Sequence, residues 1–424
     1  MKKNINAIIL AAGKGTRMKS DTSKVLHKIF DKTLLGYVID AVNKTELIEK
    51  SFVIVGHQAE QVEKFVKDNY DNASTALQMP QLGTGHAVSM VCPQLEDFGG
   101  EVIILCGDTP LITQKTLKDF IEFHRVKNSD LTVMSAIFEN PTNYGRIVRD
   151  GDKLASIVEE KDASPAQKKI KEVNAGIYLL NWQTIKPAFS QLTSNNAQGE
   201  YYLTDIISWG GAQGLNVNAY TLENNEEIFG INSKAHLAEA TQILNKTIIN
   251  KHLENGVTIV DPNSTWISID TQIGADTVIY PSTYITGKNV IGNNCKIGPF
   301  AHIRGDVELG DNVKIGNFVE VKKTKIASNT NACHLTYIGD SEIGSGVNVG
   351  AGTITANYNH STKAKNKTVI KDGASIGSNS VLVAPAVIGK GAVVGAGTVV
   401  TKDVADKSLA VARPAMKTVE NYTK

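Results

Sequence analysis

A glycine-rich segment near the N-terminus carries the residue types that best suit phosphate binding. Residues 10–18 read Leu-Ala-Ala-Gly-Lys-Gly-Thr-Arg-Met, and Lys24 follows them. The apolar run at residues 5–9 comes just before and predicts the buried first strand of a parallel sheet. Small residues let backbone N–H groups approach a phosphate closely, and Arg17 and Lys24 add positive charge. The segment therefore predicts a site for a nucleoside triphosphate.

This loop is not one of the two commonest phosphate-binding motifs. In the phosphate-binding loop of many NTPases a lysine and then Ser or Thr follow the second glycine, whereas Thr16 follows Gly15 here. The dinucleotide fingerprint needs a glycine where Met18 stands. The alternative interpretation is a glycine-rich turn whose cationic side chains are only solvated.

A carboxylate is predicted at the same edge of the sheet. Asp108 follows residues 101–106, a second apolar run that predicts a strand. The carboxyl ends of parallel strands lie together, so Asp108 is expected to face the phosphate loop. A carboxylate facing a triphosphate needs a cation between them, and Mg²⁺ pairs carboxylates with phosphate oxygens. The alternative is a turn or helix-capping aspartate before Thr109 and Pro110.

Length and composition limit the class of protein. A chain of 424 residues can form two or three domains, and its net charge of +1 gives no reason to expect nucleic acid or an anionic membrane as a partner. The four cysteines form no Cys-x-x-Cys pair, which favours a reduced protein without disulfides or zinc. No secretory segment and no apolar run of about 20 residues is present. We therefore expect a soluble cytoplasmic protein.

The chain divides into three parts. Residues 1–231 alternate strand-like and helix-like stretches, with a helix expected at 34–42 and a strand at 52–56, which predicts a Rossmann-like α/β domain with a mostly parallel sheet. Residues 232–253 have helical spacing and predict a helical linker. The remainder, residues 254–424, has a different pattern.

In this last part an aliphatic residue recurs every six positions. One series runs from Ile267 to Val321 and another from Ile370 to Val400. A six-residue period predicts a parallel β-helix built from short stacked strands. The phase slips after Val321, and the repeat is interrupted between Thr355 and Ile370. We expect functional residues where the repeat is interrupted.

The motif at residues 10–18, followed by Ser23-Lys24, resembles the signature of sugar-1-phosphate nucleotidyltransferases. The later strings His334-Leu335-Thr336-Tyr337 and Asn357-Tyr358 narrow the resemblance to the bacterial bifunctional enzymes with N-acetylglucosamine-1-phosphate uridylyltransferase and glucosamine-1-phosphate N-acetyltransferase activity. The resemblance covers nearly the whole chain. It implies a left-handed β-helix, a homotrimer with active sites between neighbouring β-helices, and a role in making a cell-wall precursor.

For the first domain the resemblance implies that the phosphate of N-acetylglucosamine-1-phosphate attacks UTP and expels pyrophosphate, with Mg²⁺ as cofactor. Arg17 and Lys24 would bind phosphates, and Asp108 with Asn232 would bind the metal. Gln78, Gly83 and Thr84 would contact uracil, and Gly145, Glu159 and Asn174 the sugar. The full predicted nucleotide and sugar site comprises Leu10, Ala11, Ala12, Gly13, Arg17, Lys24, Gln78, Gly83, Thr84, Cys106, Gly107, Asp108, Gly145, Glu159, Asn174 and Asn232.

For the β-helix the resemblance implies acetyl transfer from acetyl-CoA to the amine of glucosamine-1-phosphate. His334 is the candidate general base, because imidazole titrates near neutral pH, and Glu320 is expected to orient it. A structural histidine is the alternative for His334. The residues implied for glucosamine-1-phosphate are Arg304, Lys322, Tyr337, Asn348 and Lys365, with Lys363 competing for the role of Lys365. Those implied for acetyl-CoA are Ala351, Asn357, Tyr358, Ser378, Gly395 and Arg413.

Two other functions are compatible with the domain pattern. One is a nucleotidyltransferase with a single activity and a regulatory β-helix, and the other makes the β-helix only a scaffold for trimers. The strings around His334 and Asn357 argue against both.

Overall fold

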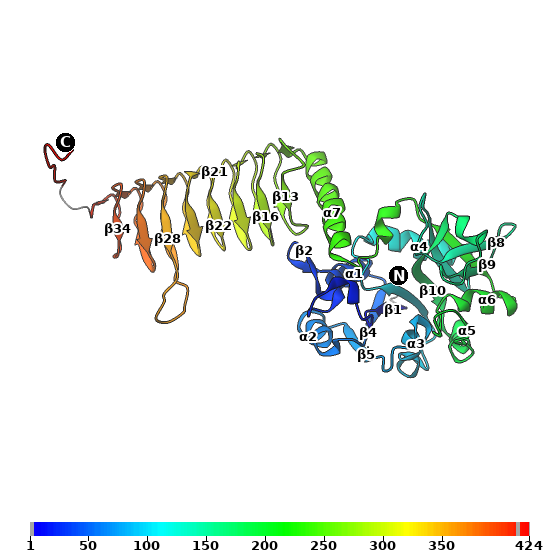
Figure 1. The fold of residues 1–424 in the computed structure, drawn as a ribbon. Coiled ribbons are helices and arrows are strands. Elements are labelled where there is room, and N and C mark those ends of the chain that lie inside the picture. The colour runs from blue at the N-terminus through cyan, green and yellow to red at the C-terminus, as the bar shows by residue number, and fades with distance from the viewer. Residues whose placement is uncertain (1–3, 413–415, 424) are drawn as a thin grey trace. The chain divides into compact units, whose positions relative to one another are not determined.

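The computed structural model describes residues 4–412 and 416–423 (Figure 1). Its internal contacts divide the chain into two compact units, Met1–Thr241 and Gln242–Lys424. Each unit is described by itself below.

The first unit is an α/β domain around one large sheet. Its strands, in spatial order, are β11 (Val217–Thr221), β7 (Leu131–Ile137), β10 (Glu172–Asn181), β6 (Glu101–Cys106), β1 (Ile5–Leu10), β4 (Ile48–Val55) and β5 (Ala73–Leu77). A hairpin of β8 (Arg146–Asp150) and β9 (Lys153–Val158) joins this sheet through β10, and β2 (Lys28–Ile29) pairs with β3 (Lys32–Thr33) separately. The helices are α1 (Leu34–Lys44), α2 (Ala59–Asn69), α3 (Thr84–Ser89), α4 (Gln114–Val126), α5 (Trp182–Ile185) and α6 (Asp205–Ala212).

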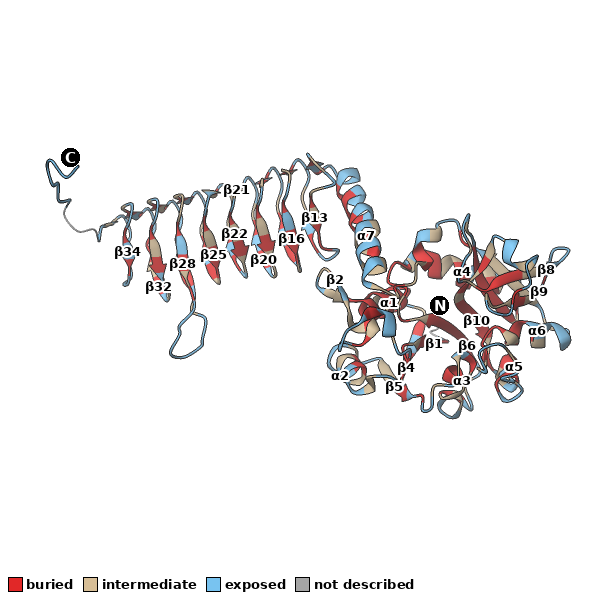
Figure 2. Cartoon of the chain, viewed as in Figure 1, coloured by how far each residue is buried: buried red, intermediate tan, exposed pale blue. Residues whose placement is uncertain are grey.

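The two faces of this sheet carry separate apolar cores. The central strands between them, such as β1 and β10, are largely buried (red in Figure 2). One core packs α1 and α4 against the sheet through residues such as Val38 and Phe120. The other packs α3, α5 and α6 through residues such as Val88, Trp182 and Ile206. Because both faces are covered, the central strands are continuous apolar runs rather than alternating ones.

The predicted α/β domain is confirmed, and its sheet is mixed. Strand β1 lies parallel to β4 and β6, so the predicted strands at 5–9, 52–56 and 101–106 do share one sheet edge. Strand β10 runs antiparallel between β6 and β7. The predicted helix at 34–42 is α1, which continues to Lys44.

The buried imidazole of His124 on α4 makes the first unit sensitive to acid. Its Nδ1 lies 2.7 Å from the hydroxyl oxygen of Thr132, and burial lowers the pKa of His124 below its ordinary value, which nearby Glu101 only partly offsets. As the pH falls, His124 is therefore protonated in the unfolded chain before it is protonated in the folded one. The free energy of unfolding decreases as the pH falls below about 6.5. In urea titrations at pH 7.5 and 5.5, followed by tryptophan fluorescence, we expect His124→Gln to lose less unfolding free energy between the two pH values than the wild type. An equal loss in both proteins would contradict this role.

The second unit is a parallel β-helix with three sheets. The first sheet contains β12 (Thr258–Ile259), β15 (Val278–Ile279), β18 (Lys296–Ile297), β21 (Lys314–Asn317), β24 (Asn331–His334), β27 (Asn348–Val349), β30 (Ser375–Ile376), β33 (Val393–Val394) and β35 (Leu409–Ala410). The second contains β13 (Trp266–Ile267), β16 (Tyr284–Thr286), β19 (His302–Arg304), β22 (Glu320–Lys322), β25 (Tyr337–Gly339), β28 (Ile354–Ala356), β31 (Val381–Val383) and β34 (Val399–Val400). The third contains β14 (Gln272–Ile273), β17 (Asn289–Ile291), β20 (Val307–Leu309), β23 (Lys325–Ile326), β26 (Ser341–Ile343), β29 (Thr368–Ile370) and β32 (Ala386–Ile388).

The aliphatic residues of the six-residue period form the interior of this unit. Ile267, Ile285 and Ile303 are successive register partners in the second sheet, and each is fully buried. Each coil thus contributes one short strand to each sheet, the arrangement of a left-handed β-helix of hexapeptide repeats. The predicted β-helix is confirmed.

Helix α7 (Lys234–Glu254) spans the boundary between the two units. Within the second unit its buried Asn245 donates to the carbonyl of Thr265 at 2.8 Å and accepts from the amide of Ile267 at 3.1 Å. These bonds satisfy backbone groups of the first coils, where no preceding strand is available. The helix therefore caps the start of the β-helix.

Candidate functional site

The loop after β1 is shaped by the close approach of a second segment. Gly15 has φ of 59°, and a Cβ there would lie 2.8 Å from the Cβ of Lys24. A left-handed backbone and this short distance both require glycine. The carbonyl of Ala12 accepts hydrogen bonds from the amide of His57 at 3.3 Å and the side chain of Gln81 at 3.2 Å. The loop is thus held against the ends of neighbouring strands, with Lys24 beside it.

Lys24 brings together the two residues predicted to bind a metal ion. Its Nζ lies 2.5 Å from Oδ2 of Asp108 and 3.2 Å from Oδ1 of Asn232. The backbone amide of Ile231 donates to the carbonyl of Asp108 at 2.9 Å, which ties the two segments together. A carboxylate and an amide oxygen that face one cationic group are ligand types suited to Mg²⁺.

These two oxygens would be only part of a metal shell. Among residues 4–412 and 416–423 there is no group of three or more His, Cys, Asp or Glu side chains that could hold a metal ion. Mg²⁺ commonly takes one or two carboxylates and completes its shell with phosphate oxygens and water. The donor set therefore fits an ion that arrives with a nucleotide better than a permanently bound one.

A cavity of about 640 Å³ opens beside this cluster. Seven of the residues predicted from the sequence line it, namely Arg17, Cys106, Asp108, Gly145, Glu159, Asn174 and Asn232. Burial raises the pKa of the Cys106 thiol to about 12, so this thiol stays protonated near neutral pH. Burial also raises the pKa of Glu159, although a hydrogen bond from the hydroxyl of Thr204 at 3.4 Å opposes the shift.

At one end of the cavity a short network positions neutral polar groups. The backbone amide of Asn174 donates to the carbonyl of Gly145 at 2.8 Å. The side chain of Asn174 donates to the hydroxyl of Tyr178 at 2.8 Å and accepts from the amide of Gly176 at 2.9 Å. The side chain of Asn174 is therefore fixed with Glu159 nearby, an arrangement that could bind the hydroxyl and amide groups of a sugar.

The residues predicted to contact a base form a separate turn. Gln78 donates to the carbonyl of Gly83 at 2.9 Å, and Thr84 accepts from the amide of Leu203 at 3.1 Å. A Cβ at Gly83 would lie 2.6 Å from the carbonyl oxygen of Tyr201, so glycine is required there. The structure brings these residues together, but they do not line the cavity. The other predicted residues outside its lining are Leu10, Ala11, Ala12, Gly13, Lys24 and Gly107.

Two aromatic contacts in the cavity wall were missed by the sequence analysis. The rings of Phe138 and Tyr144 are stacked with centroids 5.0 Å apart, and those of Phe229 and His236 lie 5.4 Å apart. His236 and Glu239 both line the cavity from α7. Their spacing of three residues places them on one helix face, but the spacing alone does not show that this face borders a cavity, and the helix was interpreted only as a linker.

In the second unit the partner of His334 differs from the predicted one. Nδ1 of His334 lies 2.7 Å from Oδ1 of Asn317. Glu320, which was expected to orient this imidazole, instead accepts from Nε of Arg304 at 2.6 Å. The contact predicted between Glu320 and this imidazole is therefore not the one that the structure has, because the carboxylate is bound to a cation on the neighbouring coil.

Three of the residues predicted for a sugar phosphate form a cationic cluster. Arg304 and Lys322 are register partners on adjacent coils. The side chain of Lys365 contacts Lys322, and this contact lowers the pKa of Lys322. Cations held this close together favour an anion between them. The contact also favours Lys365 over Lys363 for this role.

The remaining predicted residues of this unit lie along nearby coils. Asn357 donates to Oδ2 of Asp340 at 2.5 Å and lies 3.4 Å from the hydroxyl of Tyr337. Val349 and Ile376 are register partners on consecutive coils. Ala351 and Ser378 each come two residues after one of them and so occupy equivalent positions on these coils. Gly395 comes one residue after Val394, which is the register partner of Ile376 on the following coil. Asn348 and Tyr358 are exposed. Arg413 lies outside the described residues.

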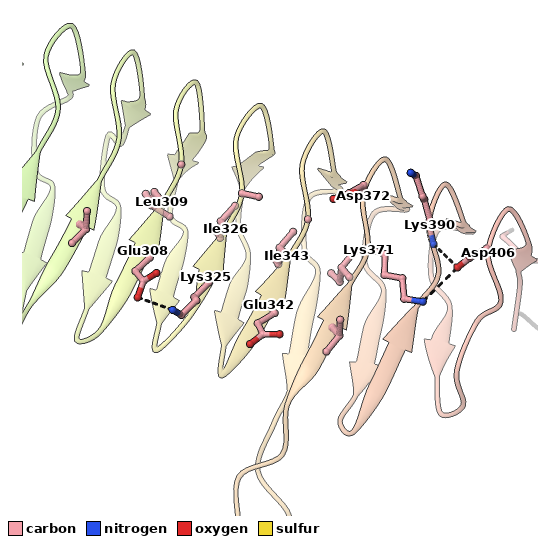
Figure 3. A pocket seen from close by; sticks show the side chains of 16 residues that line it. Glu308, Leu309, Lys325, Ile326, Glu342, Ile343, Lys371, Asp372, Lys390 and Asp406 are labelled. Atoms are coloured by element: carbon pink, nitrogen blue, oxygen red, sulfur yellow. Dashed lines mark hydrogen bonds and ion pairs between the residues drawn. The ribbon is translucent and has the colours of Figure 1, made fainter.

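A groove of about 740 Å³ lies along the third sheet of the β-helix (Figure 3). Its charged side chains are largely paired with one another, as in Glu308–Lys325 at 2.8 Å and Lys371–Asp406 at 3.7 Å. None of the described residues predicted to bind glucosamine-1-phosphate or acetyl-CoA lines it. The groove is therefore distinct from the predicted acetyl-transfer site.

Comparisons with known proteins assign both units. A family described as nucleotidyl transferase matches residues 6–252, and one described as bacterial transferase hexapeptide (six repeats) matches residues 290–323 and 367–402. No helix in the described part of the chain is long and apolar enough to cross a membrane.

Full-length relatives have the same combination. The bifunctional protein GlmU of Geobacillus sp. (strain WCH70) is 44% identical over 98% of this chain and 97% of the relative. Those of Alkaliphilus metalliredigens (strain QYMF) and Bacillus subtilis (strain 168) are each 42% identical over 99% of this chain and 98% of the relative. Because the similarity extends through both units, this chain belongs to the GlmU family of bifunctional proteins, with a nucleotidyltransferase unit and a hexapeptide-repeat transferase unit.

Proposed function

We propose that this chain catalyses two consecutive reactions. It transfers an acetyl group from acetyl-CoA to the amine of glucosamine-1-phosphate, and then a uridylyl group from UTP to the resulting N-acetylglucosamine-1-phosphate. The products are UDP-N-acetylglucosamine, which is a cell-wall precursor, together with free CoA and pyrophosphate. The observation that carries the proposal is that one chain holds both a phosphate loop opposite Asp108 and a β-helix that carries His334, held by Asn317, together with a cluster of cations.

Uridylyl transfer in the first unit needs no side-chain base. The attacking phosphate is already an anion, so the protein has to position the substrates and neutralise charge. Mg²⁺ bound by Asp108 and Asn232 would neutralise charge on the triphosphate. Arg17 lines the cavity, and Lys24 contacts Asp108, which also lines it, so both cations are assigned to phosphate oxygens.

The sugar and the base are assigned to the two polar regions of this unit. Gly145, Glu159 and Asn174 would bind the sugar within the cavity. Gln78, Gly83 and Thr84 would bind uracil at their turn. The remaining loop residues Leu10, Ala11, Ala12, Gly13, Cys106 and Gly107 would surround the nucleotide through backbone groups and small side chains.

Acetyl transfer in the second unit depends on His334. Nε2 of its imidazole would take a proton from the substrate amine, so that the amine can attack the thioester carbonyl. Arg304, Lys322 and Lys365 would bind the sugar phosphate, and Tyr337 and Asn348 the sugar. Acetyl-CoA is assigned to Ala351, Asn357, Tyr358, Ser378, Gly395 and Arg413. Glu320 would act indirectly, by holding Arg304.

We also propose that the chain works in the cytoplasm as a homotrimer, with the β-helices in contact near His334. Phe300, Phe318 and Leu335 form an exposed apolar edge beside it, with 52%, 55% and 61% of their surfaces accessible. The two phenylalanine rings are stacked 5.1 Å apart, and all three residues have positive φ values of 56°, 56° and 49°. Large apolar side chains aligned in this way on a surface are typical of a protein interface.

The double variant Phe300→Asp/Phe318→Asp tests this edge. The double variant adds two carboxylates to each subunit, or six to a trimer, and these like charges would oppose association. We therefore expect monomers in sedimentation experiments, with acetyl transfer lost and uridylyl transfer retained. Val290→Asp, a charge at an exposed position bordering the groove of the third sheet, is the matched control and should remain trimeric. If the double variant still formed trimers, or if the control variant became monomeric, the subunit contact would lie elsewhere on the β-helix.

The proposed pair of reactions is tested with purified protein. Thiol release from acetyl-CoA should depend on glucosamine-1-phosphate, and pyrophosphate release from UTP should depend on N-acetylglucosamine-1-phosphate. Pyrophosphate release without thiol release would instead support a nucleotidyltransferase whose β-helix is regulatory or serves only as a trimer scaffold.

A further inference from the structure

We propose that Asn317 is the positioning residue that sets the orientation and the proton position of the His334 imidazole. This inference rests on the proposed role of His334 as the base of acetyl transfer. The contact between Oδ1 of Asn317 and Nδ1 of His334, at 2.7 Å, is its starting observation.

The backbone places these two side chains together. Asn317 ends β21 and His334 ends β24, and they are register partners in parallel strands. The amide of Leu335 donates to the carbonyl of Asn317 at 3.0 Å, and the hydroxyl of Thr336 donates to the carbonyl of His334 at 2.6 Å. Both residues are therefore held from the main chain as well as through the side-chain contact.

The two strands also approach each other unusually closely at this point. A Cβ at Gly316, the residue before Asn317, would lie only 1.8 Å from the carbonyl oxygen of Cys333. No other residue type could stand at 316 without separating the coils. The glycine thus allows the short distance over which Asn317 reaches the imidazole.

The type of atom that faces the imidazole determines which nitrogen can act as a base. Oδ1 of Asn317 can only accept, so Nδ1 of His334 must carry the hydrogen. The lone pair is then on Nε2, where it is available to the substrate amine. Without this partner the neutral ring would also populate the other tautomer, in which Nε2 is protonated and cannot accept a proton.

Asn317 is a neutral partner of the imidazole, and the ionisable residues on the strands around His334 are placed as follows. Strand β21 contributes Lys314, whose register partner is Asn331, three residues before His334, and β27 contains no ionisable residue. Cys333 is the neighbour of His334 on its own strand, and Glu320 is bound to Arg304. A carboxylate in place of the amide would stabilise the protonated ring and leave less free base near neutral pH.

The test compares Asn317→Asp with Asn317→Ala in the full-length chain. Aspartate keeps the acceptor and adds a charge, so the acid limb of the pH dependence of kcat/KM for acetyl transfer should move up by about one pH unit, with the alkaline rate retained. Alanine removes the acceptor, so kcat should fall by about tenfold or more, with KM for glucosamine-1-phosphate nearly unchanged. Asn331→Asp and Asn331→Ala, on the same strand as His334, are the matched controls and should behave as the wild type.

The outcomes separate this inference from the proposed function. Asn317 variants whose pH profile and kcat equal those of the wild type would overturn the positioning role, as would an alanine variant that changes only KM. A His334→Ala protein that still transfers acetyl groups would overturn the proposed base itself. Unchanged uridylyl transfer in every variant would verify that the first unit is folded, and an unchanged sedimentation profile and thermal unfolding curve would verify the same for the β-helix.

Discussion

Asp108→Ala is expected to lower the rate of UDP-N-acetylglucosamine formation from UTP by at least about a thousandfold, because charge neutralisation is the main catalytic contribution at this site. Oδ2 of Asp108 lies 2.5 Å from Nζ of Lys24, and Oδ1 of Asn232 lies 3.2 Å from the same ammonium group. In the proposed metal site, removing this carboxylate would leave the amide oxygen of Asn232 as the protein's contribution to the binding of Mg²⁺. Pyrophosphate release measured at increasing Mg²⁺ concentration should show a rate that saturating metal does not restore.

Two further variants make this result specific. Asp108→Asn keeps the shape of the side chain but removes its charge, so we expect a loss close to that of alanine. Asp119→Ala removes a carboxylate that pairs with Lys115 on α4, outside the cavity lining, and should leave the rate unchanged. Acetyl transfer should be normal in all three proteins. Its loss from Asp108→Ala without unfolding would contradict the separation of the two sites.

His334→Ala is expected to lower the rate of acetyl transfer by about a thousandfold, the usual contribution of a general base. The Nδ1 side of its ring is held by Asn317, so the opposite nitrogen is the one available to substrate. Thiol release from acetyl-CoA measures the loss, and uridylyl transfer from supplied N-acetylglucosamine-1-phosphate should continue at the wild-type rate.

A matched histidine variant and chemical rescue sharpen the interpretation of this loss. His360→Ala removes an exposed imidazole from the loop after Tyr358 and should have little effect. Added imidazole should partly restore acetyl transfer in His334→Ala if the missing group is a base. A slow variant that shows a raised KM and no rescue would indicate that His334 binds substrate instead.

The elements of both units follow from local patterns and were largely predictable. The apolar run at residues 101–106 forms β6. The six-residue period correctly predicts which side chains of successive coils are buried, as at Ile285 and Ile303. Such patterns report burial along the chain but not strand direction. The antiparallel placement of β10 between two other strands was therefore not predictable from its apolar residues.

The partner of His334 shows how a small change in the repeat alters a site. A regular coil here has 18 residues, as from Ile285 to Ile303, but Asn317 and His334 are register partners 17 residues apart. The phase slip after Val321 shortens this coil by one residue. The residue 17 positions before His334 is Asn317, its register partner. The residue 17 positions after Glu320 is Tyr337, so Glu320 is the register partner of Tyr337 and not of His334. The signal was present in the sequence but was not used to assign the orienting residue.

Residues of the first site were predictable where a motif follows a strand, as for Asp108 after β6. The contributions of His236 and Glu239 were not, because a helix pattern does not show which of its faces borders a cavity. The contact of Lys24 with both Asp108 and Asn232 joins residues 84 and 208 positions apart, which no local pattern could reveal.

Mixing the two inactive proteins tests most directly the claim that one chain carries two independent sites. Asp108→Ala and His334→Ala are each incubated with glucosamine-1-phosphate, acetyl-CoA, UTP and Mg²⁺, separately and together, and UDP-N-acetylglucosamine is quantified by chromatography. Neither protein should form it alone. The mixture should, because the acetylated intermediate made by the first protein is a substrate for the second. A mixture that stays inactive, or a single variant that makes the product, would contradict the account.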